Sequence, residues 1–406
     1  MMERSEPALL LPAVLAGTAR LPAGQLNRDA WTRLVDDAAV HQVAPLVWRR
    51  LNESGDAEHL PAEARQRLEA EHTLAALRAR SWRAQLDAIL EVLAADSIEV
   101  TTLKGVHLAI HLYGFPAARP MADLDLLIRP EQGQRAMEAI VRLGYARPAG
   151  EAMSSYAAHR HYPPLKRRGR LPVELHTTVD PCEPPFRLSL EDVWARTQPD
   201  EMLNTGTRVL CAEDLLLHLS THMGYSHLLG SSLVRVCDIA VWLDRFSSEV
   251  DWDAIVSRSR ASGTGKFVYS SLELARRVLG AQVPEAARVA LRTDANDVAV
   301  DAATRLLVHP WRVLPDMLLL SRSGTPVWSA IRRVTAGLLL PPARHRSGAP
   351  DPVDERDVLA GRSRYRERWK AALHAAGSPL AARDALRGLR QVRQLWAWAR
   401  EQPESL

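Results

Sequence analysis

The segment "TLKGVHLAIHLYGFPAARPMADLDLLIRP", residues 102–130, decides the predicted fold. Residues 98–103, "IEVTTL", are short and rich in β-branched side chains, which is typical of a strand. A Lys-Gly pair follows, and then "VHLAIHLY" has the spacing of a helix. Further along, Asp123 and Asp125 stand one residue apart in an apolar run. The segment therefore predicts a strand, a glycine-containing turn, a helix and a second strand with two acids.

The residues around this segment complete a small unit. "DLDLLI" (123–128) predicts a buried strand, and a helix is expected from Pro130 to Gly144. Residues 161–179 form two extended runs around a basic turn, which predicts a β-hairpin whose second strand contains "VELHTT". Three strands and two helices would make an α+β unit with a small mixed sheet at about 96–180.

Most of the remaining chain has apolar residues three and four apart, which indicates helices. We expect an N-terminal helical region at 1–95, a helical domain at 181–342, and a linker with a helical tail at 343–406. Separate helices are predicted within the second of these regions at 214–222, 233–246, 251–262 and 266–279. The predicted fold class is therefore α+β, with a small mixed sheet embedded in a mainly helical chain.

Composition indicates an ordinary globular protein. The chain has 406 residues, of which 47% are hydrophobic, and its net charge of +4 arises from well-mixed acidic and basic residues. Three distant cysteines without a CxxC motif indicate a reducing cytosol and therefore a cytoplasmic protein. Abundant arginine and alanine, with only four lysines, indicate a GC-rich bacterial genome.

Two apolar patches and a tail with tryptophans need an interpretation. The N-terminal patch (1–17) is shorter than the roughly 20 residues of a membrane span and predicts a helix on the protein body. The second patch (327–342) contains two arginines and predicts an amphipathic core helix more than a membrane contact. No integral membrane segment is expected. Three tail tryptophans are expected to pack between helices: Trp369, Trp396 and Trp398.

Three acids are the candidate catalytic and metal-binding residues. Strand alternation places Asp123 and Asp125 on one face, where two carboxylates repel unless they share a cation such as Mg²⁺ or Mn²⁺. Glu174, on another predicted strand, supplies a third carboxylate. Such a set can hold two cations about 3.5–4 Å apart, which is the chemistry of nucleotidyl transfer from a nucleoside triphosphate. An aspartate at a strand start can alternatively do no more than cap a turn.

Four further residues are candidates for nucleotide binding. Gly105 at a helix N-terminus permits close approach of phosphate, and Lys104 adds a cation. Arg119 is suited to a bidentate phosphate contact. His176 either faces the site, where it could bind phosphate or position Glu174, or is an ordinary polar residue near a strand end.

Four motifs carry a resemblance to a known family: Leu103-Lys104-Gly105, "RPMADLDLLI" (119–128), Gly144-Tyr145 and Glu174-Leu175-His176. Over about residues 98–180 the chain resembles the uncharacterised nucleotidyltransferase family of the DNA-polymerase-beta-like superfamily. The resemblance implies that Asp123 and Asp125 bind both metal ions, and that Glu174 binds the catalytic metal and helps to deprotonate the acceptor. The superfamily usually has Gly-Gly or Gly-Ser at the turn, so the Lys-Gly pair is a departure.

The resemblance implies a Mg²⁺-dependent nucleotidyltransferase that transfers a nucleoside monophosphate from an NTP to an acceptor. The acceptor stays open among a small molecule, a sugar, a peptide and RNA. A toxin-like enzyme that modifies tRNA or protein is one alternative, and a catalytically inactive nucleotide-binding or scaffold protein of a biosynthetic cluster is another. The toxin-like alternative rests on a basic cluster that could equally be a solvated hairpin tip: His159, Arg160, His161, Lys166, Arg167, Arg168 and Arg170.

Other polar residues in the helical domain have simpler interpretations. His218 and His222 have the spacing of a zinc pair, but without nearby cysteines or an HExxH glutamate we expect them to pack against the cleft. Asp238 lies in an apolar helix and requires a partner such as Arg235 or a histidine. Serine-hydrolase and Walker motifs are absent from the sequence, which argues against these two classes.

Overall fold

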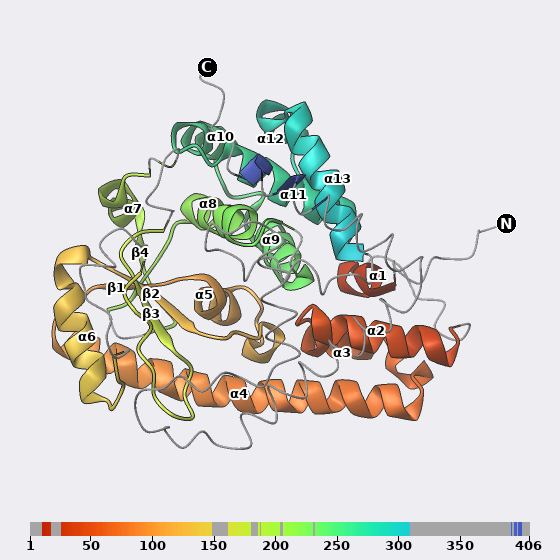
Figure 1. Ribbon diagram of the computed structural model, residues 1–406, viewed down its shortest axis with the longest axis horizontal. Coiled ribbons are helices and arrows are strands. Elements are labelled where there is room, and N and C mark those ends of the chain that lie inside the picture. The colour runs from red at the N-terminus through yellow and green to blue at the C-terminus, as the bar shows by residue number, and fades with distance from the viewer. Residues whose placement is uncertain are drawn as a thin grey trace, which may run out of the picture.

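The structure is a computed structural model that is mainly helical, with a five-stranded mixed sheet among its described residues (Figure 1). This confirms the predicted α+β class with a small mixed sheet. The described residues are 10–17, 26–147, 161–179, 186, 188–203, 206–229, 232–308 and six positions between 391 and 399.

The sheet has the strand order β3-β2-β1-β5-β4. Its strands are β1 (Val100–Thr102), β2 (Leu124–Ile128), β3 (Val173–His176), β4 (Gln198–Pro199) and β5 (Arg208–Val209). β1 pairs antiparallel with β2 and parallel with β5, and β2 pairs parallel with β3. The three predicted strands are confirmed. β4 and β5, which pair antiparallel, were not predicted, because strands of two residues have no measurable alternation.

The predicted return of the chain along β3 is also present. Leu165 bridges antiparallel to Val173, and His161 bridges antiparallel to His176. The chain turns between them at Gly169, whose φ of +70° lies in the left-handed region that glycine tolerates. Residues 161–165 therefore lie along the free edge of β3, beside the face that carries the acids.

The helices account for most of the described chain. They are α1 (Leu10–Ala16), α2 (Arg28–Val40), α3 (Ala44–Ser54), α4 (Ala62–Ala95), α5 (Lys104–His111), α6 (Gly133–Arg142), α7 (Leu190–Arg196), α8 (Ala212–Thr221), α9 (Leu233–Phe246), α10 (Trp252–Ala261), α11 (Gly265–Leu279), α12 (Glu285–Leu291) and α13 (Asp294–Val308). Helices α8 to α11 confirm the four predicted within the second helical region. Short 3₁₀ helices cover Asp56–His59, Pro116–Ala118 and Pro130–Gln132, and a π-helical turn covers His222–Ser226.

Two hydrophobic cores share the long helix α4. The first core joins α1 to α3 with α8, α9, α11 and α13, so the N-terminal helices and the second helical region pack together. The second core lies between one face of the sheet, α6 and the C-terminal half of α4. Leu68 of α4 belongs to the first core and Leu86 to the second. Figure 1 shows α4 running below both parts, with α8 and α9 above α5.

Both ends of the described chain pack on the body. Leu11 of α1 is buried in the first core, as the sequence predicted. The Trp398 ring lies 5.3 Å from the Phe267 ring, and its Nε1–H donates to Asn296 Oδ1 at 3.0 Å, so this tryptophan packs between helices. Trp369, Trp396, the linker and the patch at 327–342 lie outside the described residues. In the described ranges, every helix is too short or too polar to cross a bilayer.

Candidate active site

The register of β2 and β3 brings two predicted acids together. Asp125 lies directly opposite Glu174, and Leu127 lies opposite His176. Because side chains alternate along each strand, Asp125, Glu174 and His176 share one face of the sheet. Leu126 points to the other face, into the second core. This places His176 on the face of the acids, one of the two possibilities that its sequence position left open.

Asp125, Glu174 and His176 form a compact group. His176 Nε2–H donates to Asp125 Oδ1 at 2.7 Å and lies 3.7 Å from Glu174 Oε2. Each of the three residues offers one potential ligand atom, and these atoms lie within 4.8 Å of one another. Among the described residues, these three have the spacing needed to hold a metal ion. Asp125 and His176 are buried, whereas Glu174 is partly exposed. Since His176 Nε2 carries a proton for Asp125, the carboxylates are the better metal ligands.

Lys104 lies against the same group. It is the first residue of α5, directly after β1 and Leu103, and its Nζ donates to Asp125 Oδ1 at 2.6 Å. The same Nζ lies 3.3 Å from His176 Nε2. Gly105 follows, and a Cβ there would lie 3.1 Å from the Cβ of Met121, closer than ordinary van der Waals contact. Glycine thus lets the segment before β2 pack closely against the start of α5, where a larger residue would require Met121 to shift.

Asp123 precedes β2 and lies near this group without belonging to it. Burial, together with the charges of Asp125 and Glu174, raises the pKa of Asp123 to about 6, and nearby Lys104 and His176 only partly offset this. The three predicted acids therefore interact electrostatically. A carboxylate that its neighbours disfavour in this way gains from a shared cation.

The other two acids have the opposite shift. Burial alone would raise the pKa of Asp125, but the Lys104 ammonium and the His176 hydrogen bond hold it below its usual value. For Glu174, burial is likewise outweighed by the His176 hydrogen bond and by His161, and its pKa is lowered. Neighbouring carboxyl groups with pKa values pushed apart are typical of sites that perform acid–base or metal chemistry.

His161 is a residue of the site that the sequence had placed in the basic cluster. Its Nε2 lies 3.9 Å from Glu174 Oε2, and its ring lies 5.2 Å from the His176 ring. Burial lowers the pKa of His161. The predicted hairpin was the available signal, because its pairing places position 161 beside position 176. His159 and Arg160 of the same cluster lie outside the described residues.

Arg119 makes a buried ion pair in place of the expected phosphate contact. Its Nε and Nη2 donate to Asp238 Oδ1 at 2.7 Å and Oδ2 at 2.8 Å, and its Nη1 donates to Pro120 O at 2.6 Å. Tyr113 adds a hydroxyl hydrogen bond to Asp238 Oδ1 at 2.8 Å. The predicted phosphate contact of Arg119 stays a prediction, and the structure shows its guanidinium paired with Asp238. Asp238 does have the partner that its burial required, although this partner is neither Arg235 nor a histidine.

The comparisons with known proteins agree with this geometry. The family model described as uncharacterised nucleotidyltransferase matches residues 27–280, more than half of the chain. The chain belongs to the uncharacterised nucleotidyltransferase family. Its activity class is the transfer of nucleotidyl groups, and the acids, Lys104 and His176 all lie within the matched range. A search of curated proteins found no match, and neither did a search of solved structures.

Two histidines of this family member pack behind the site. His218 Nδ1–H donates to Val179 O at 2.7 Å, and burial lowers the pKa of His218 to about 3. His222 lies at the start of the π-helical turn, with its Nε2 3.2 Å from His227 Nε2. The His218 and His222 rings are stacked 6.4 Å apart, and among the described residues these histidines are not part of a group with the spacing of metal ligands. They are packing residues in this nucleotidyltransferase fold, as the sequence indicated.

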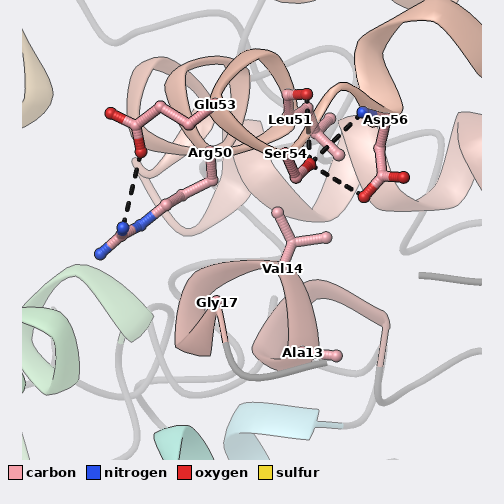
Figure 2. Close-up of a pocket in the computed structure, with 8 residues that line it drawn as sticks. All are labelled: Ala13, Val14, Gly17, Arg50, Leu51, Glu53, Ser54 and Asp56. Carbon is pink, nitrogen blue, oxygen red and sulfur yellow. Dashed lines mark hydrogen bonds and ion pairs between the residues drawn. The ribbon is translucent and has the colours of Figure 1, made fainter. Parts of the chain in front are cut away.

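A surface pocket of the nucleotidyltransferase is lined by residues of the N-terminal helices (Figure 2). It is formed by α1 and the end of α3, with apolar Ala13 and Val14 on one side. Across it, Arg50 lies 3.6 Å from Glu53, and Ser54 donates to Asp56 at 2.9 Å. Its polar residues thus pair with one another. None of the predicted site residues lines this pocket.

Proposed function

We propose that this protein is a Mg²⁺- or Mn²⁺-dependent enzyme that transfers a nucleoside monophosphate from an NTP to a nucleophilic acceptor and releases pyrophosphate. The observation that carries this proposal is the convergence of Asp125, Glu174 and His176 within 4.8 Å on one face of the sheet. Asp123 lies close enough for the other two acids to raise its pKa. Family membership supplies the reaction class.

The side chains fit a hard divalent cation. Asp123, Asp125 and Glu174 supply carboxylate oxygens, which Mg²⁺ and Mn²⁺ prefer. Burial, and then the charges of Asp125 and Glu174, raise the pKa of Asp123, and a bound cation would offset both effects. A divalent ion held there would supply charge neutralisation for the triphosphate and a lower pKa for the attacking group.

Other groups at the site would orient a metal ligand, bind phosphate and accept a proton. The His176 hydrogen bond fixes the orientation of the Asp125 carboxylate. The first backbone N–H groups of α5, from Lys104 and Gly105, lie at a helix N-terminus, where they favour an anion such as phosphate. Glu174 has a lowered pKa and is partly exposed, so at neutral pH it is an ionised group that can accept a proton from an incoming hydroxyl.

The test is incubation of the purified protein with each α-³²P-labelled NTP and Mg²⁺ or Mn²⁺, in the presence of a cell extract that supplies the acceptor. Pyrophosphate release and label transfer are both measured. We expect activity in the wild type and loss of it in Asp123→Asn, Asp125→Asn and Glu174→Gln. Asp36→Asn is the matched control, because Asp36 is exposed and pairs only with Arg67 on the surface. Equal signals in all five proteins would contradict the proposal.

The labelled product also separates the alternatives. Label in RNA or in a protein would favour the toxin-like enzyme. Two arginines of the basic cluster are occupied by the protein itself, because Arg167 donates to Leu143 O at 2.7 Å and Arg170 donates to Ser81 Oγ at 3.2 Å. We therefore propose a small molecule, sugar or peptide acceptor ahead of RNA. A catalytically inactive scaffold would transfer no label under any of these conditions.

A further inference from the structure

Asp125 has one oxygen that is already fully engaged. Its Oδ1 accepts hydrogen bonds from Lys104 Nζ at 2.6 Å and from His176 Nε2 at 2.7 Å. The side chains of Asp125 and Lys104 are only 4% and 12% exposed, so this contact is sheltered from water. An aspartate bridges two metal ions either by giving one oxygen to each or by sharing one oxygen between them, and an oxygen that already accepts two hydrogen bonds is poorly available for either arrangement. In this chain, Oδ1 is occupied by an ammonium and an imidazole.

The backbone shows that this placement of Lys104 is imposed by the fold. Lys104 has a φ of +44°, in the left-handed region that non-glycine residues rarely adopt. Such a conformation is strained for a side chain with a Cβ and persists only where surrounding contacts determine it. The neighbouring Gly105, which could adopt it freely, is instead packed against Met121. The chain therefore retains a strained lysine at a turn that glycine would fit better.

The charges of the site favour one bound divalent ion over two. Asp123, Asp125 and Glu174 contribute three negative charges when ionised, and Lys104 contributes one positive charge. One divalent ion neutralises the two negative charges that remain, whereas a second would leave an excess of positive charge. A second cation close to Asp125 would also lie beside the ammonium and be repelled by it.

We propose that the Lys104 ammonium is a resident cation that takes the place of a second divalent ion at Asp125. The chain then binds one divalent ion, held by Asp123, Glu174 and the second oxygen of Asp125. This inference rests on the proposed function, but it differs from the two-metal set that the family resemblance implies. It gives the Lys-Gly turn a role, because a glycine at position 104 would remove the ammonium from Asp125 and leave His176 as the donor to Oδ1.

The test is a titration of the purified full-length chain with Mn²⁺ alone, in which electron paramagnetic resonance counts the free ion. The variants are Lys104→Gly, which removes the ammonium and relieves the backbone strain, and Lys104→Met, which removes the charge at similar length. Lys166→Met is the matched control, because Lys166 is an exposed lysine outside the group around Asp125. Circular dichroism in EDTA establishes that each variant is folded, and Lys104→Gly keeps the test valid if strain unfolds Lys104→Met.

We expect one bound Mn²⁺ in the wild type and in Lys166→Met. In the folded Lys104 variants we expect a second ion, or at least about tenfold tighter binding of the first, because like-charge repulsion has been removed. A smaller change in these variants, or two ions in the wild type, would overturn the inference. Two ions in a wild type that still transfers label would leave the proposed function intact. A wild type that binds no Mn²⁺ and transfers no label would overturn both.

Discussion

The segment that precedes β2 contributes to two clusters of charged side chains, which differ in their ratio of acidic to basic groups. In the first cluster, the single carboxylate of Asp238 is matched by the Arg119 guanidinium and the Tyr113 hydroxyl. In the second, three carboxylates share one ammonium, that of Lys104. The first is a closed ion pair, whereas in the second the carboxylates outnumber the single ammonium, and the other contacts are hydrogen bonds and electrostatic contacts with His176 and His161.

The pKa shifts in the two clusters follow from burial and from this difference in charge. In the first cluster, burial and then the Asp238 charge raise the pKa of Tyr113 well above its usual value, so its hydroxyl stays a donor. In the second, the pKa of Asp123 is raised to about 6 while that of Asp125 is lowered. A balanced buried pair holds the structure together. An unbalanced group of acids instead provides a place for a cation and for proton transfer.

The largest expected effect is on activity in the unbalanced cluster. Asp125→Asn removes the carboxylate that contacts both Lys104 and His176, and we expect label transfer to fall by about 10³-fold or more. The measurement is kcat for pyrophosphate release at saturating NTP. Arg119→Met is the comparison from the balanced cluster. If the folded fraction of Arg119→Met loses as much activity as Asp125→Asn, the separation between a structural and a chemical cluster fails.

The next effect is on stability in the balanced cluster. Arg119→Met leaves the buried Asp238 carboxylate without its cation, and we expect the free energy of unfolding to fall by about 3–5 kcal/mol. Urea denaturation measures this change. The double variant Arg119→Met/Asp238→Leu should recover most of it, because no unpaired charge remains. A loss below about 1 kcal/mol in the single variant would show that the pair is not sheltered from water.

A smaller effect is expected in the pH dependence of stability without metal. Because the folded pKa of Asp123 is about 6, above its ordinary 3.8, ionisation of this group opposes folding. In EDTA, its contribution is favourable at low pH and is lost as the pH rises from about 3.8 to 6, by about 3 kcal/mol. Asp123→Asn should therefore be more stable than the wild type at pH 8 and should lack this slope. If the free energy of unfolding of Asp123→Asn changes with pH as it does in the wild type, another group causes the pH dependence.

The smallest effect is expected for an exposed ion pair outside both clusters. Arg28 and Glu63 join α2 to α4 with an N–O distance of 2.9 Å, and their side chains are 74% and 66% exposed. Glu63→Gln should change the free energy of unfolding by less than about 1 kcal/mol and leave label transfer unchanged. Urea denaturation and the transfer assay measure the two quantities. A larger loss would mean that exposure does not distinguish structural from dispensable charge in this protein.

Local sequence was enough to predict the sheet face of the candidate site. β-branched and apolar runs marked β1, β2 and β3, and period-two alternation placed Asp123 and Asp125 on a common face. Helical spacing likewise marked α8 to α11 and the position of α1. These features depend on residues within a few positions of one another, and they can therefore be predicted from the sequence alone.

Contacts between residues that are distant in the sequence could not be predicted in this way. Arg119 meets Asp238 across 119 positions, so an arginine beside the acids was interpreted as a phosphate ligand. The side chain of Lys104 reaches Asp125 because α5 begins directly after β1, a geometry that spacing alone does not determine. The two-residue strands β4 and β5 depend on pairing with β1 and carry no local signal.

The most direct test of the account is a crystal of the full chain grown with Mn²⁺, with diffraction data collected at the manganese absorption edge. The account predicts an anomalous peak about 2.0–2.3 Å from carboxylate oxygens of Asp123, Asp125 and Glu174, with Lys104 still in contact with Asp125. Absence of a peak at these three acids, at a Mn²⁺ concentration that supports label transfer, would contradict the claim that they converge to hold the ion.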